Sequence, residues 1–161
     1  MTDKSHFMKN RCLCGIALAI IFYCASVGLT GCCKDDWEPY ISDVRVSSLY
    51  THPETGKDVF SCHAALSNAY ISERDASGVS CYFQFSEAED FDVFLSYRAE
   101  VSKQTLAPFS SRFYLSAACS VYPADGFKEG KVYYLRVLVI TNDGRTYLSK
   151  TYETIFDKEN Q

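Results

Sequence analysis

The chain has 161 residues, of which eight are cysteine and 15% are aromatic, and its formal net charge is −4. Without the apolar N-terminal region about 130 residues remain, which is enough for one domain with its own core but hardly for two. The acidic balance argues against binding to a nucleic-acid backbone, because such binding needs a basic patch. We therefore expect no nucleic acid among the partners.

The N-terminal region has the three parts of a secretory signal. Lys4, Lys9 and Arg11 precede an apolar stretch over 13–29, and small residues end it. This stretch is nearly as long as a bilayer-spanning helix, which takes about 20 residues, so a retained transmembrane anchor is the competing interpretation. The true start is Met1 or Met8, since "MKNRCLCG" also reads as the beginning of a signal.

The end of the apolar stretch, "LTGC", resembles the lipobox of bacterial lipoproteins. The resemblance implies that Leu29, Thr30 and Gly31 are recognised by the signal peptidase and that Cys32 becomes the lipidated first residue. Stable anchoring needs more than one lipid chain, and a triacylated cysteine meets that requirement. We therefore expect the protein to be attached to a membrane through Cys32.

A charged cluster follows the lipidation site. Lys34, Asp35 and Asp36 stand where an acidic cluster resembles the surface-export signal of Bacteroidota-type lipoproteins. The resemblance implies an outer-membrane lipoprotein on the cell surface. A solvated tether without a further role is the alternative, and the sequence leaves periplasmic and external orientations open.

Four cysteines remain in the mature chain once the signal is removed and Cys32 is lipidated. They are Cys33, Cys62, Cys81 and Cys119, and four cysteines allow three full pairings. An exported protein folds where disulfides persist. No two of the four lie at zinc-ligand spacing, so we predict no metal site and no cofactor.

Beyond residue 40, apolar and polar residues alternate with the period of β-strands, and no window has a long helical repeat. We predict seven strands in the order 41–50, 59–67, 78–86, 91–101, 111–121, 131–140 and 145–156. Such a series of short strands separated by turns indicates an all-β fold, a seven-stranded antiparallel β-sandwich. The predicted organisation is a signal peptide over 1–31, a tether over 32–39, the sandwich over 40–157 and a polar tail over 158–161.

The segment "FKEGKVYYLRVLVITNDGRTY" resembles the closing strands of a fibronectin type III domain. Gly130 stands at the glycine of that pattern, Tyr133 at its tyrosine-corner position and Gly144 at its turn glycine, whereas Glu129 and Thr141 depart from it. The resemblance implies a fibronectin-type-III-like or Ig-like sandwich. In such a fold the Tyr133 ring fills the end of the core and its hydroxyl bonds upstream backbone.

The same topology makes the second and fifth strands neighbours. Cys62 and Cys119 fall on these strands and face inward, so a Cys62–Cys119 disulfide is our hypothesis. Buried free thiols are the alternative, and Cys81 also faces inward and could replace either partner.

The mature sequence has no recognisable catalytic constellation. Its only histidines are His52, in a turn, and His63, on the outward phase of a strand, and no nucleophile motif accompanies them. The acidic loop over 87–92 could bind calcium, but it lacks EF-hand spacing, and such loops are usually only solvated. We predict that the protein is not an enzyme.

The outward phase of the strands is unusually apolar for a solvated sheet face. The predicted binding face consists of Tyr82, Tyr97, Tyr134, Leu138 and Ile140. Exposed aromatic and aliphatic groups of this kind suit a protein partner or a glycan, although loops or the N-terminal segment could cover them.

The sequence therefore predicts a non-catalytic, lipid-anchored cell-envelope protein that acts as a binding or adhesion module or as an assembly subunit. One alternative is a glycan-binding accessory lipoprotein of a polysaccharide-uptake system. Another is a small hydrolase or an accessory subunit of an enzyme.

Overall fold

A computed structural model describes residues 37–105, 107, 110–123 and 126–157. The part from Trp37 onward forms one compact unit. The predicted signal peptide, the start at Met1 or Met8 and the tail over 158–161 lie outside the described residues. So do the lipidation and export residues Leu29, Thr30, Gly31, Cys32, Lys34, Asp35 and Asp36.

The domain is all-β, as predicted, apart from one short helix in the described residues. Its elements are β1 (Ser42–Val46), β2 (Tyr50–Thr51), β3 (Asp58–Ala65), β4 (Ile71–Ser72), α2 (Glu73–Ala76), β5 (Ser80–Ser86), β6 (Phe94–Thr105), β7 (Arg112–Val121), β8 (Val132–Ile140), β9 (Thr146–Leu148) and β10 (Tyr152–Ile155).

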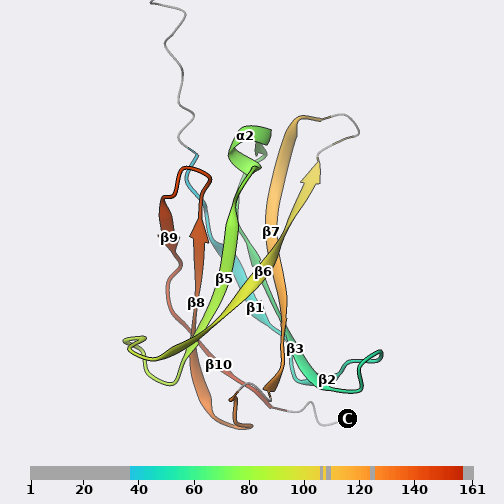
Figure 1. Cartoon of the computed structure of the whole chain (residues 1–161), viewed down its shortest axis with the longest axis vertical. Coiled ribbons are helices and arrows are strands. Elements are labelled where there is room, and N and C mark those ends of the chain that lie inside the picture. The colour runs from blue at the N-terminus through green and yellow to red at the C-terminus, as the bar shows by residue number, and fades with distance from the viewer. Residues whose placement is uncertain (1–36, 106, 108–109, 124–125, 158–161) are drawn as a thin grey trace, which may run out of the picture. The chain divides into compact units, whose positions relative to one another are not determined.

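The strands form a curled antiparallel sheet in the order β1-β3-β7-β6-β5-β8-β10, with β2 on β3, β4 on β7 and β9 on β8. The long strand β6 connects the two halves, because its residues 94–99 pair with β5 and its residues 100–105 pair with β7. In Figure 1, β1 and β3 pass behind β5 and β6. The concave face of the curl encloses the core.

Period-two alternation places the predicted apolar faces inside the curl. The inward residues of β3, β5, β7 and β8 are buried, and they include Phe60, Phe83, Leu115 and Val137. One end of the core is aromatic: Phe60 stacks on Phe156 with ring centroids 3.9 Å apart, and Phe85 and Phe127 contact both rings. This packing holds the two halves of the sheet together.

The predicted last strand is divided into β9 and β10. Between them, the Ser149 backbone N–H donates to the Val137 carbonyl, and the Ser149 hydroxyl accepts from the Val137 N–H. The serine side chain thus replaces a backbone acceptor, and the regular ladder is interrupted. The helix α2 was not predicted either; it begins where the Ser72 side chain accepts from the Asp75 N–H.

Gly130 and Gly144, the two glycines of the fibronectin-type pattern, have backbone conformations that favour glycine. Gly144 has φ +81° in the turn after β8, and Gly130 has φ +74° before it. The Gly144 N–H donates to the Thr141 carbonyl, which closes the predicted hairpin turn. The Gly130 N–H donates to the Phe156 carbonyl and so joins the β8 entrance to the end of β10.

Candidate functional site

The outer face of the β5–β8–β9 part of the sheet has a row of apolar side chains. Tyr82 is the cross-strand partner of Leu138, and Leu138 is the partner of Leu148. Ile140 lies two residues further along β8, on the same face, between Ser80 and Thr146. We call Tyr82, Leu138, Ile140 and Leu148 the apolar strip.

The strip is on the solvent side because its neighbours in sequence are core residues. Cys81 and Phe83 flank Tyr82 and are fully buried, and Val137 and Val139 do the same for Leu138. Tyr82, Leu138 and Ile140 are half-buried, and Leu148 is 55% exposed. Arg98 on β6 pairs with Tyr82 and puts a cation at one end of the row.

Three of the predicted binding-face residues thus come together, and the strip includes Leu148, which sequence reasoning missed. Its position follows from the turn at Gly144, since a hairpin closed there pairs Leu138 with Leu148 and gives both side chains the same face. Pairing the residues on either side of the predicted turn would have placed Leu148 opposite Leu138.

Tyr97 is not part of this face, so that prediction was wrong. It pairs with the buried Phe83, and its ring contacts Phe85 and Phe127 inside the curl. Strand alternation puts Tyr97 in phase with the core residue Ala99 rather than with Arg98.

The other half of the outer face is covered by the loop between β5 and β6. Phe91 is only 5% exposed, and the Arg136 guanidinium lies 4.1 Å from its ring centroid. The Arg136 Nε donates to the Gln84 Oε1 at 2.8 Å, and Gln84 is buried although it is on the outward phase. Phe91 has φ +56°, an unfavourable value for a bulky side chain, so these contacts must offset backbone strain.

Tyr134 lies at this covered end and not in the strip. Its cross-strand partners are Ser86, which is buried, and Glu153 on β10. The outer face therefore has a covered part near Tyr134 and an open part at the apolar strip.

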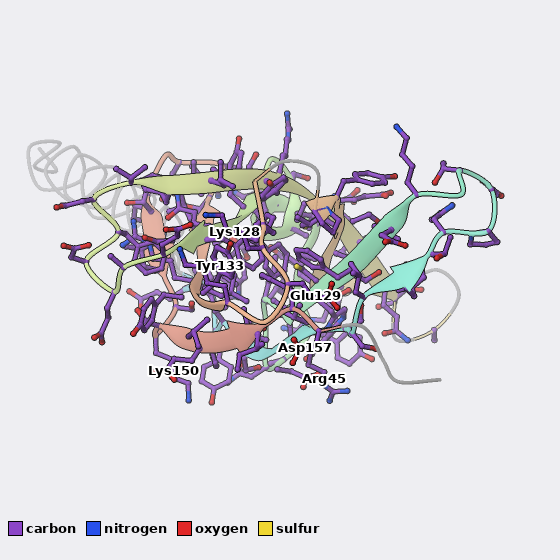
Figure 2. All side chains as sticks on the ribbon, turned by 90° about the horizontal axis from the view of Figure 1, so that it is seen from below. Arg45, Lys128, Glu129, Tyr133, Lys150 and Asp157 are labelled. Carbon is purple, nitrogen blue, oxygen red and sulfur yellow. The ribbon has the colours of Figure 1, made fainter. Side chains whose placement is uncertain are left out.

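Tyr133 has the structural position that the sequence predicted. Its ring is 3% exposed and contacts Phe127 and Phe156, and its hydroxyl accepts from the Lys128 N–H at 2.8 Å. Figure 2 shows Lys128 next to Tyr133 at this end of the domain. The hydrogen bond between Tyr133 and Lys128 holds the segment that leads into β8 against the end of the core.

The cysteines predicted to pair are directly opposite each other. Cys62 on β3 is the cross-strand partner of Cys119 on β7, and both are unbonded thiols. The hydrogen bond to Cys119, together with burial, raises the pKa of the Cys62 thiol far above its ordinary value. Cys81 is also fully buried, and burial followed by the nearby Cys119 raises its pKa to about 12.

The remaining polar candidates are dispersed. His52 lies in the turn before β3, and its Nδ1 accepts from the Glu54 N–H; His63 is exposed on β3. In the acidic loop, Glu87 bonds to Lys131, and this bond lowers the pKa of the Glu87 carboxyl. Within the described ranges, no three His, Cys, Asp or Glu side chains gather as metal ligands.

Among the helices of the described residues, none is long and apolar enough to cross a membrane. Comparisons of the chain with known protein families, with curated proteins and with solved structures found no match.

Proposed function

We propose that the protein is a non-catalytic, lipid-anchored binding module of the bacterial cell envelope, and that it binds a protein partner through the apolar strip. The observation that carries this proposal is the open row Tyr82–Leu138–Leu148 across three adjacent strands. Isolated apolar residues on a surface are ordinary, but a contiguous row on a sheet face is typical of an interaction site.

The strand order supports a fibronectin-type-III-like or Ig-like sandwich as the scaffold. Sandwiches of this type place the first, second, fifth and fourth strands in one sheet and the third, sixth and seventh in the other. Here β1, β3, β7 and the second half of β6 are neighbours, and β5, β8 and β10 are neighbours. The Tyr133 hydroxyl bond to the Lys128 backbone also supports this type, whereas a β6 shared by both halves is a departure.

The sequence before residue 37 supports the anchor. The "LTGC" segment follows an apolar signal and resembles a lipobox, so Cys32 would carry the lipid. The charged residues Lys34, Asp35 and Asp36 favour export to the cell surface, on the outer leaflet of the outer membrane. Replacing Cys32 with alanine should abolish incorporation of a labelled fatty acid in growing cells.

A protein partner fits the strip better than a glycan does. Sugar rings stack on flat, accessible aromatic rings and also need polar groups beside them. The strip has one tyrosine, half-buried, and its other members are Leu138, Ile140 and Leu148. Aliphatic groups with a tyrosine and a flanking Arg98 are the composition of a protein interface core and rim.

The proposal is tested by placing a photo-crosslinking amino acid at Leu148 in the full-length protein and irradiating intact cells. The matched control is Ile155, which is an equally exposed aliphatic residue, 53% against 55%, on an edge strand away from the strip. One protein crosslinked from position 148 but not from 155 is the expected result. Equal crosslinking from both positions, or none from 148, would contradict it.

A further inference from the structure

The strands β6 and β7 diverge at one point of the curled sheet, and a pocket opens there. Their last paired residues are Glu100 and Ala118; beyond them β6 continues along β5, whereas β7 continues along β3 alone. The solvent-open pocket has a volume of about 350 Å³ and is lined by Ser61, Arg98, Glu100, Ala118, Cys119 and Ser120.

This pocket gives the two paired cysteines different access to solvent. Cys119 is half-buried and is among the residues that line the pocket, whereas its cross-strand partner Cys62 is fully buried and does not line it. Directly opposite residues in an antiparallel pair have Cα atoms about 4.5–5.5 Å apart, which is within the range that a disulfide spans. The two sulfurs can therefore be bonded without moving the strands, but only Cys119 can meet a reagent from outside.

We propose that Cys62 and Cys119 form a thiol–disulfide exchange site in which Cys119 reacts with a small-molecule disulfide in the pocket and Cys62 resolves the product. The Cys119 thiolate attacks one sulfur of the small disulfide, the S–S bond of that molecule breaks, and its other half leaves as a thiolate. Cys62 then loses its proton and attacks the Cys119 sulfur. The second half leaves, and the Cys62–Cys119 bond is formed.

The reaction is balanced without another reactant. Two protein thiols are oxidised to one disulfide, one external disulfide is reduced to two thiols, and the two protons lost by the protein are taken up by the two thiolates that leave. The hydrogen bond to Cys119 and burial raise the pKa of the Cys62 thiol. This suits Cys62 as the resolving thiol, because it stays protonated until Cys119 has reacted. A pocket of this size admits a small disulfide rather than a folded protein.

Cys81 provides an internal control. It is fully buried on β5, beside Ala99, and does not line the pocket. We therefore expect Cys81 to remain a thiol while the other two are oxidised.

The test uses the full-length protein in isolated membranes, mildly reduced and then treated without denaturant with a maleimide or with oxidised glutathione. Trypsin separates the three cysteines, since cleavage after Lys57, Arg74, Arg98, Arg112 and Lys128 leaves one in each of the segments 58–74, 75–98 and 113–128. Maleimide should label Cys119 at least about tenfold faster than Cys62 or Cys81, because these two react only when strands open. Equal rates for Cys119 and Cys62 would overturn the proposal.

Oxidised glutathione should link the segments 58–74 and 113–128 in the wild type. In Cys62→Ala the glutathione adduct should persist on Cys119, because no resolving thiol remains. In Cys119→Ala neither Cys62 nor Cys81 should form an adduct. Adducts at Cys62 in that variant, formed at the wild-type rate, would contradict the proposal, and the maleimide rates of the wild type decide the question even where a variant fails to fold.

Discussion

Replacing Tyr133 with phenylalanine removes one hydroxyl and leaves the aromatic packing unchanged. The ring is 3% exposed and stays among Phe127 and Phe156, while the Lys128 N–H loses the acceptor that lies 2.8 Å away. An unsatisfied donor costs about 1–3 kcal/mol when it is buried. This hydrogen bond is only partly buried. We therefore expect a loss at the lower limit, about 1 kcal/mol in the free energy of unfolding.

This loss is measured by urea unfolding of the domain from Trp37 onward, followed by circular dichroism. The urea midpoint should fall with an unchanged denaturant slope, and in thermal unfolding of the same domain the melting temperature should fall by roughly 4 °C. Tyr134→Phe is the matched control, because Tyr134 is half-buried on the outer phase of the same strand; it should change stability by less than about 0.5 kcal/mol. Equal effects of the two substitutions would refute the role given to the Tyr133 hydroxyl.

Phe60→Ala should destabilise the domain by about 3–5 kcal/mol in the same assay, because it opens a cavity in the aromatic end of the core; a loss below about 1 kcal/mol would contradict that packing. Phe91→Ala removes the ring beside Arg136, so amide hydrogen exchange of the loop over 87–93 should accelerate while β8 remains protected. Unchanged exchange rates in this loop would show that Phe91 does not hold it in place. The hydrogen bond from the Thr141 hydroxyl lowers the pKa of the Asp143 carboxyl in the folded protein. The ionised carboxylate therefore stabilises the fold above the ordinary pKa of 3.8, and this stabilisation is lost as the pH falls through the lower pKa of the folded state. Asp143→Asn should therefore lose less stability than the wild type on acidification below about pH 4. If the two proteins gave parallel curves of unfolding free energy against pH, the Asp143 carboxylate would make no such contribution.

The core faces could be read from the sequence because alternation in a strand depends only on local geometry. Phe60, Cys62, Phe83 and Leu115 are buried as their phase predicted. The turn at Gly144 was predictable for the same reason, since its positive φ is a local requirement.

Features that depend on distant segments could not be read in this way. The point at which the long strand β6 changes partners is one such feature, because no local signal marks it. The phase of Tyr97, in contrast, could have been read from its alternation with Arg98 and Ala99. The cover over Gln84 and Ser86 depends on Phe91 adopting a conformation that phenylalanine rarely takes. The pocket beside Cys119 likewise results from two strands that diverge, and each of them reads as an ordinary strand.

The substitution Leu148→Asp shows whether the apolar strip binds a protein. Leu148 is 55% exposed, so the substitution should leave folding intact, as should Ile155→Asp at the matched control position. Binding of the crosslinked partner, measured in titrations with the purified variants, should weaken by roughly tenfold or more for Leu148→Asp and remain unchanged for Ile155→Asp. Unchanged affinity of Leu148→Asp, or equal weakening in both variants, would show that the partner does not bind at the strip.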